Sequence, residues 1–396
     1  MITPASNHLL HVSPQQSRLV ELDWLRVLAF GLLILYHTGM LYAENWGWHY
    51  KSAYSSKFLP NIMLWSNQWR MSLLFLISGA ALSCVLMQKA WYRVLVKRIP
   101  FLLLPLVFGM LVIVVPQVYV EANSTGVIIS PNFWYFWYIY LDQHSVEFAN
   151  HKTIGGMQLT WNHLWFLPYL IAYTLLACVL YPLGRLAVVR WLWQWVREKV
   201  SIGMVVFVPM VIFYAISSLL NENNPVTHNF VQDWLNHARS CTAFFLGFML
   251  VRMPALWSNL CVYRWHFLWP ALLSYVYTLC FFHGVRWEGG AFARELNHFL
   301  WAANAWLWIL VVVAWVQYWF TESNAILRYF NSGIFCFYIL HQTLIIVFAY
   351  FIAPFKVGAF LEPIIVIGSV VISCIILFEI IKRLPVVRLC FGIHRF

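Results

Sequence analysis

The sequence predicts an all-α fold, a polytopic bundle of about ten membrane-spanning helices. Of its 396 residues, 62% are hydrophobic and only 10% are charged, and the mean hydropathy is +0.72. Soluble domains are about 25% charged, so this chain has too little polar surface to cover a water-facing globule. The apolar residues also form many runs of ~20, and each run is long enough to cross ~30 Å of hydrocarbon as a helix. A soluble enzyme with one anchor is therefore excluded.

Hydropathy gives ten spans. In chain order they cover residues 22–42, 61–87, 101–120, 163–182, 202–220, 239–251, 267–282, 296–318, 334–351 and 363–381. The sixth is the shortest. We expect residues 1–396 to form a single integral membrane domain, with tails at residues 1–21 and 382–396.

The basic residues indicate how the bundle is oriented. With both termini in the cytoplasm, the inner connections hold sixteen Lys or Arg residues and the outer connections hold six. Positive residues are retained on the cytoplasmic side of a membrane, so this split favours ten spans with both ends inside. The net charge of +11 comes from residues dispersed between apolar runs, which is not the continuous stripe that binds nucleic acid. We expect no nucleic-acid partner and no metal.

The first span contains three ionisable residues, Asp23, Arg26 and His37. A charge inside the bilayer costs several kcal/mol, so each is a functional-site hypothesis. Eleven residues separate Arg26 from His37, which is three helical turns and roughly 16 Å, so both project from one face. That face carries a cation near the inner headgroups and a titratable base deep in the membrane.

The second span brings Arg70 to the depth of His37 if the two helices adjoin. An arginine at that depth must pair, form hydrogen bonds or face water, so it is either a structural partner inside the bundle or a catalytic cation. Ser78 and Gly79 follow on the same helix, and small residues there also serve close helix packing. Arg239 falls within the sixth span.

Further polar residues recur near membrane depth. His163 and Trp165 open the fourth span, Asn331 lies at the inner mouth of the ninth, and Tyr338 and His341 lie within it. Because Tyr338 and His341 are three residues apart, they occupy neighbouring faces of one helix. A lone intramembrane histidine is often a hydrogen-bonded packing residue, and that interpretation of His341 stays open.

A basic cluster lies between the second and third spans. Lys89, Arg93, Lys97 and Arg98 suit the phosphates of a nucleotide. The alternative is that they only set topology and contact anionic lipid. An aromatic run at residues 132–140 is too short to span, and it is either an interfacial anchor or a stacking surface for sugar rings.

Taken together, these residues resemble the acyltransferase 3 family of integral membrane proteins. The segments that carry the resemblance, in family order, are Leu22-Asp-Trp-Leu-Arg26 with Tyr36-His37, Arg70-Met71, Phe75-Leu-Ile-Ser-Gly79, His163-Leu-Trp-Phe-Leu167, and Asn331 with Tyr338-Ile-Leu-His341. The closing Phe378-Glu-Ile-Ile-Lys-Arg-Leu-Pro385 is most similar to the glucans biosynthesis protein C branch, which is associated with glucan succinylation. Many members carry Arg-x-x-Arg before the proline of the third helix, whereas here Arg93 and Arg98 precede Pro100 with a different spacing.

The resemblance implies transfer of an acyl group from cytoplasmic acyl-CoA, as succinyl-CoA or acetyl-CoA, to a hydroxyl of a carbohydrate beyond the outer face. It also implies that His37 is central to transfer and that Arg26 matters. Imidazole is the side chain best suited to accept a hydroxyl proton near neutral pH, and a nearby Arg70 would stabilise the oxyanion. Arg93, Lys97 and Arg98 would bind the donor, and we expect no bound cofactor.

We therefore expect a membrane O-acyltransferase in a bacterial inner membrane, surrounded by lipid. A transporter or flippase is the main alternative, because intramembrane His37, Arg70 and His341 are also typical of proton or substrate paths. A purely structural or assembly role is a third hypothesis.

Overall fold

The computed structural model describes residues 19–126, 128, 130, 132–142, 144–148, 159–220, 225–285 and 289–393. The expected tail residues 1–18 and 394–396 lie outside the described residues. The described chain is helical and contains no named strand, which confirms the all-α prediction. Its α-helices are α1 (Val20–Tyr42), α2 (Leu59–Asn67), α3 (Arg70–Gln88), α4 (Trp91–Phe108), α5 (Val115–Thr125), α6 (Phe133–Leu141), α7 (Phe166–Leu180), α8 (Ala187–Lys199), α9 (Ile202–Leu220), α10 (Trp234–Leu250), α11 (Pro254–Asn259), α12 (Arg264–Phe282), α13 (Gly290–Trp319), α14 (Ala325–Ile352), α15 (Leu361–Ile381) and α16 (Val387–Cys390).

Among the described residues, eight helical segments are long and apolar enough to cross a membrane. They are Val20–Tyr42, Leu59–Gln88, Trp91–Thr125, Asn162–Arg185, Ile202–Leu220, Gly290–Trp319, Ala325–Phe355 and Leu361–Ile381. The pair Trp234–Leu250 and Pro254–Phe282, bent by 103°, makes up to nine. This pair contains the sixth and seventh predicted spans, which pass the test of length and hydropathy only together. The structure thus supports a polytopic bundle of eight or nine spans where hydropathy predicts ten.

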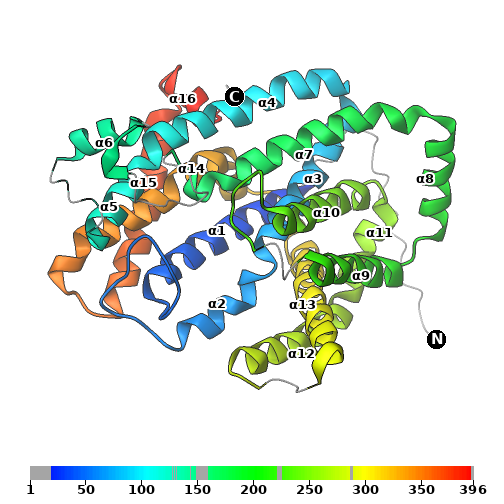
Figure 1. The fold of residues 1–396 in the computed structure, drawn as a ribbon. Coiled ribbons are helices and arrows are strands. Elements are labelled where there is room, and N and C mark those ends of the chain that lie inside the picture. Colours follow the sequence, from blue (N-terminus) through cyan, green and yellow to red (C-terminus); the bar gives the residue numbers. More distant parts are fainter. Residues whose placement is uncertain are drawn as a thin grey trace, which may run out of the picture.

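Two helix pairs form the centre of the bundle. Helices α1 and α14 lie side by side and form the first pair. Helices α3 and α10 form the second pair, and α3 packs against α1 (Figure 1). Glycine allows the close crossing of α3 and α10. A Cβ atom added to Gly79 would lie 1.9 Å from the carbonyl oxygen of Phe244, and one added to Gly247 would lie 2.0 Å from that of Leu76. Gly79 therefore serves close packing.

The third span is continuous from Trp91 to Thr125 but changes its winding in the middle. Between α4 and α5, residues Gly109–Ile113 form a π-helical turn. Such turns leave carbonyl groups without their usual hydrogen bond within the helix. Here two of these carbonyl groups accept hydrogen bonds from side chains of α6. Tyr140 donates to the Met110 carbonyl over 3.1 Å and Trp137 donates to the Leu111 carbonyl over 2.9 Å. These bonds dock the aromatic helix α6 on the span, so the run at residues 132–140 is a short helix packed beside α5.

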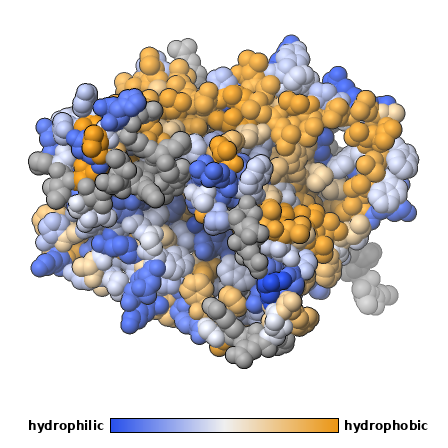
Figure 2. All heavy atoms as spheres, viewed as in Figure 1, coloured by the Kyte–Doolittle hydropathy of each residue, from blue (hydrophilic) through white to orange (hydrophobic). Residues whose placement is uncertain are grey.

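The surface of the bundle is divided by polarity. Figure 2 shows apolar side chains gathered over α4, α7 and α9, and more polar side chains on the opposite lower part of that view. Helix α8 projects from the end of α7 across the end of the bundle (Figure 1), and none of its residues is buried. A broad apolar girdle of this kind suits contact with lipid.

We predict that Gly79→Ala lowers the free energy of unfolding by at least about 2 kcal/mol, because the new methyl group meets the Phe244 carbonyl and the helices must separate. The measurement is thermal unfolding in detergent. The matched control is Gly31→Ala in α1, where nothing lies within 4 Å of the added Cβ, and helix propensity alone gives a gain of up to about 1 kcal/mol. Equal stability of the two variants would contradict the packing role.

Candidate active site

Two polar contacts join α1 to α14, one near each end of the segment they share. Arg26 Nη1 donates to Asn331 Oδ1 over 3.0 Å, and His37 Nδ1 lies 3.0 Å from His341 Nε2. Both helices advance in the same direction between these contacts, so they run parallel. The ring of Phe30 on α1 also packs against His341 on α14, with 5.4 Å between the ring centroids. Arg26 and His37 therefore both face α14, as their spacing predicts.

The first of these contacts belongs to a small polar cluster. Asp23 Oδ1 accepts from Asn331 Nδ2 over 2.9 Å and from Arg26 Nη1 over 3.4 Å. Arg26 lies three turns from His37 along α1, roughly 16 Å away. It does not line the cavity described next, so the geometry assigns it, with Asp23 and Asn331, to holding the register of α1 on α14.

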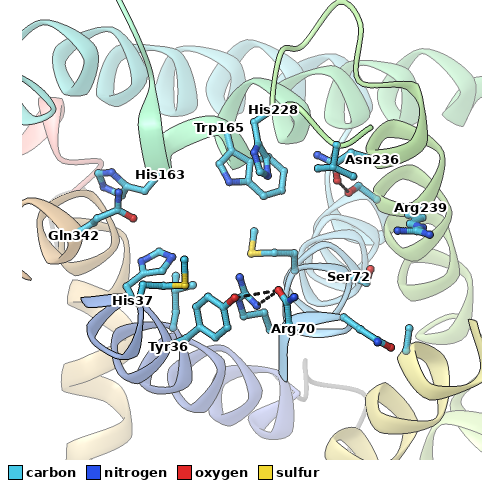
Figure 3. A pocket seen from close by; sticks show the side chains of 18 of the residues that line it. Tyr36, His37, Arg70, Ser72, His163, Trp165, His228, Asn236, Arg239 and Gln342 are labelled. Carbon is cyan, nitrogen blue, oxygen red and sulfur yellow. Dashed lines mark hydrogen bonds between the residues drawn. The ribbon is translucent and has the colours of Figure 1, made fainter. Parts of the chain in front are cut away.

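The second contact opens onto a cavity of about 470 Å³ that is lined by residues of α1, α2, α3, α9, α10, α13 and α14 (Figure 3). Of the residues singled out from the sequence, His37, Arg70, His163, Trp165 and Tyr338 line it. Its other described lining residues are Leu33, Tyr36, Met40, Trp48, Asn67, Gln68, Met71, Ser72, Asn162, Phe213, Ser217, Val226, His228, Asn236, Arg239, Ser240, Trp301, Ala302, Ala305 and Gln342. No residue of the whole described lining is acidic, and two of its residues, Arg70 and Arg239, are arginines.

The Tyr338 carbonyl fixes the tautomer of His341, and His341 fixes that of His37. His341 Nδ1 lies 2.7 Å from the Tyr338 carbonyl oxygen, which can only accept, so Nδ1 carries the proton. In the neutral ring His341 Nε2 then holds a lone pair and accepts from His37 Nδ1–H. The remaining nitrogen of His37, Nε2, is left with a lone pair on a side chain that lines the cavity. This chain of carbonyl, His341 and His37 orients a base toward the cavity.

Arg70 is held against Tyr36 and Asn67 on the wall of the same cavity. Its guanidinium carbon lies 3.3 Å from the ring centroid of Tyr36, the residue before His37. Asn67 Oδ1 accepts from Arg70 Nη1 and from the Tyr36 hydroxyl, each over 3.1 Å. Figure 3 shows these bonds and places Arg70 at the cavity wall beside Tyr36. The cavity is thus lined both by the candidate base, His37, and by a cation, Arg70, as the sequence-based hypothesis for Arg70 requires.

His163 is fully hydrogen-bonded, which sets it apart from His37. Its Nε2 donates to the Ile339 carbonyl over 3.0 Å, and its Nδ1 accepts from Gln117 Nε2 over 3.2 Å. Gln117 Oε1 in turn accepts from Asn162 and Gln342, each over 3.1 Å. With both ring nitrogens engaged, His163 has no free lone pair for a substrate proton. It positions the wall of the cavity next to α14.

Tyr338 also serves this wall. Its hydroxyl donates to the His163 carbonyl over 2.7 Å, while its own carbonyl accepts from His341. Tyr338 thus links the segment that opens α7 to the histidine pair. The side chain of Ser78 is half-buried on α3 and is not among the described residues that line the cavity.

A loop before α10 covers part of the cavity and carries His228. The buried carboxylate of Asp233 accepts from the backbone N–H of Thr227 and of His228 and from the Tyr169 hydroxyl. Asp233 therefore holds the loop, and its bond to His228 is to the main chain, not to the ring. The His228 ring packs on Trp165, with 4.4 Å between centroids. Burial lowers the pKa of His228 below its ordinary value, an effect that Asp233 opposes and Arg70 reinforces.

A second cavity, of about 450 Å³, lies at the junction of α3 and α4. The basic residues predicted to bind the donor, Arg93, Lys97 and Arg98, all line it, together with Lys89. Its described lining contains no carboxylate. The structure thus gathers the basic cluster around one concave site, which we call the basic pocket.

Comparison with known proteins gives one match. The acyltransferase domain family, Acyl_transf_3, matches residues 19–379. The chain belongs to this family. No curated protein and no solved structure matches it. Membership supports a membrane acyltransferase activity in general, and the matched region contains both cavities and the α1–α14 pair.

Sequence reasoning did not nominate Arg239 and Trp48, which line the cavity, or Gln117, which bonds its wall residues His163, Asn162 and Gln342. Arg239 was visible as a charge within a span, and that signal alone was sufficient to nominate it. Gln117 is an amide inside an apolar run, a weaker signal of the same kind. Trp48 lies in the connection between α1 and α2, 5.4 Å from the His37 ring by centroids, and no pattern in the sequence marks it.

Proposed function

We propose that the protein transfers an acyl group, succinyl or acetyl, from cytoplasmic acyl-CoA to a hydroxyl of a glycan on the far side of a bacterial inner membrane. The observation that carries this proposal is the orientation of His37. In a chain of the acyltransferase domain family, a histidine whose tautomer is fixed by a second histidine lines a cavity and retains a free ring nitrogen.

In the proposed reaction His37 Nε2 accepts the proton of the acceptor hydroxyl as the oxygen attacks the thioester carbonyl. A C–O bond forms, the C–S bond breaks, and the proton passes from His37 to the departing CoA thiolate. Because His341 accepts from His37 Nδ1, the ring keeps its orientation while Nε2 gains and loses the proton. General-base catalysis of this kind contributes about 10²–10⁴-fold.

Arg70 supplies the second requirement of acyl transfer. The thioester carbonyl becomes an oxyanion in the tetrahedral intermediate, and a fixed cation in a cavity with little water stabilises it. Stacking on Tyr36 and the bond to Asn67 hold the guanidinium in place. Its Nε has no hydrogen-bond partner among the described residues, so the group retains donor capacity for a substrate.

The basic pocket is the proposed site for the CoA nucleotide. Its four basic side chains provide charge for the phosphates, and the distribution of basic residues in the sequence favours a cytoplasmic position for this end. Helix α3 connects the two cavities, with Ser72 at one and Val85 at the other, about 20 Å apart along its axis. The thioester arm would follow this direction from the pocket to His37.

The cavity also suits a sugar. Trp48, Trp165 and Trp301 line it, and indole rings offer flat apolar faces with a polar edge. Trp48 Nε1 has no hydrogen-bond partner among the described residues, so it retains a donor for a hydroxyl. These features support a carbohydrate acceptor.

We predict that His37→Ala lowers the rate of acyl transfer by about 10²–10⁴-fold, because the acceptor hydroxyl loses its base. The measurements are CoA release by the purified protein with a glycan extract, and mass spectrometry of glycans from a deletion strain complemented with each variant. The control is His283→Ala, since His283 is an exposed residue that bonds Asn61 and does not line the cavity.

Glycan modification that persists at the wild-type level in His37→Ala, with normal protein abundance, would contradict the proposal. Acceptor-independent, proton-driven uptake of a solute into proteoliposomes would instead indicate a transporter.

We predict that Arg98→Gln raises the KM for acyl-CoA about tenfold and leaves kcat nearly unchanged, because one charge-assisted bond to a phosphate is lost. The measurement is initial rate against acyl-CoA concentration. Arg197→Gln on the exposed helix α8 is the control for a basic residue that does not line the pocket. Equal KM values for the two variants would show that the basic cluster serves topology or lipid contact only.

A further inference from the structure

Arg239 is a second cation on the wall of the main cavity, and the proposed reaction does not use it. It lies in α10 and lines the cavity together with Arg70. Figure 3 places it on the opposite side of the cavity from His37. Its one recorded hydrogen bond is from Nη2 to Ser217 Oγ, over 3.0 Å. Within the described residues Arg239 forms no ion pair with a carboxylate.

Two acidic side chains of the described residues are already engaged by other groups, Asp233 just before α10 and Glu295, which bonds the neighbour of Ser217. Asp233, six residues earlier, accepts from two backbone N–H groups, the Tyr169 hydroxyl and Asn236 Nδ2. Glu295 accepts from Tyr214 over 3.1 Å and from Ser218, the neighbour of Ser217, over 2.7 Å. Turning either carboxylate to Arg239 would break these bonds. Among the described residues, no carboxylate therefore neutralises the arginine.

Arg239 is half-buried, and inside a membrane protein an arginine without a counter-charge faces water or a ligand. The same cavity holds another donor without a partner, Gln68 Nε2. The described lining contains no Asp or Glu that would repel an anion. Guanidinium is also the group that matches a carboxylate or phosphate with two parallel hydrogen bonds.

We propose that Arg239, supported by Ser217, is a subsite for an anionic oxyacid group on the substrate, at the end remote from the atoms that react at His37. The inference rests on the proposed acyl transfer. The chemistry required is a carboxylate or similar anion. It has two possible sources, the distal carboxylate of a dicarboxylic acyl group on the donor or an acidic substituent on the acceptor. In either case Arg239 determines specificity and does not take part in bond making.

The test compares pairs of ligands that differ in one charge. The first pair is succinyl-CoA and acetyl-CoA, and the second is an oligosaccharide of glucuronic acid and its glucose counterpart. Dissociation constants are measured for wild type, Arg239→Gln and Arg239→Lys. The control is Arg252→Gln, which removes an arginine just beyond the other end of α10, bonded to Ser83 and outside the described lining of the cavity.

We expect the wild-type protein to bind the charged member of one pair about 10- to 100-fold more tightly, the size of a charge-assisted bond to a buried group. Arg239→Gln should remove that preference and leave binding of the neutral member unchanged, Arg239→Lys should keep part of it, and Arg252→Gln should keep all of it. A preference within the first pair identifies the donor as the source of the anion, and one within the second identifies the acceptor.

Equal affinity for both members of both pairs in wild type, or a preference that survives in Arg239→Gln, would overturn the subsite. Failure of the proposed acyl transfer would be distinguished from this result by His37→Ala, because that variant loses transfer of every acyl group whereas Arg239→Gln changes only the selectivity between charged and neutral ligands.

Discussion

The contact between His37 and His341 determines how this bundle can act on a substrate. A histidine without hydrogen-bond partners can exchange tautomers and rotate its ring. Here the Tyr338 carbonyl fixes the proton of His341, and His341 in turn fixes that of His37. The same constraint requires α1 and α14 to lie in one register, which the Asp23, Arg26 and Asn331 cluster secures three turns away. Arg26 thus contributes to this register although it does not line the cavity.

Both cavities carry positive charge in their described linings, which suits the proposed anionic donor. The basic pocket at the start of α4 and the arginines of the main cavity are separated by the length of α3, and neither cavity has a carboxylate in its described lining. Cations inside a membrane protein are costly and often mark a substrate or ion path. An anionic, elongated molecule with a reactive centre between charged ends would satisfy both cavities. The close α3–α10 crossing at Gly79 and Gly247 holds these walls together.

Much of this arrangement was accessible from the sequence, for identifiable reasons. Hydropathy located the spans because each must cover the hydrocarbon thickness, although it divided the bent α10–α12 region into two full spans. The eleven-residue spacing of Arg26 and His37 gave their common face. What the sequence did not show were contacts between distant segments: the pairing of His37 with His341, the saturation of His163 by Gln117, and the folding of the His228 loop over the cavity. Those depend on tertiary packing, which periodicity does not encode.

The account is tested most directly by an experimental structure of the protein with a non-hydrolysable acyl-CoA analogue bound. We predict the nucleotide in the basic pocket among Lys89, Arg93, Lys97 and Arg98, and the carbonyl carbon of the acyl group in the main cavity, with His37 Nε2 directed at the space beside it. An analogue whose nucleotide lies elsewhere, or whose carbonyl does not reach the cavity of His37, would contradict the central claim that this histidine pair serves acyl transfer.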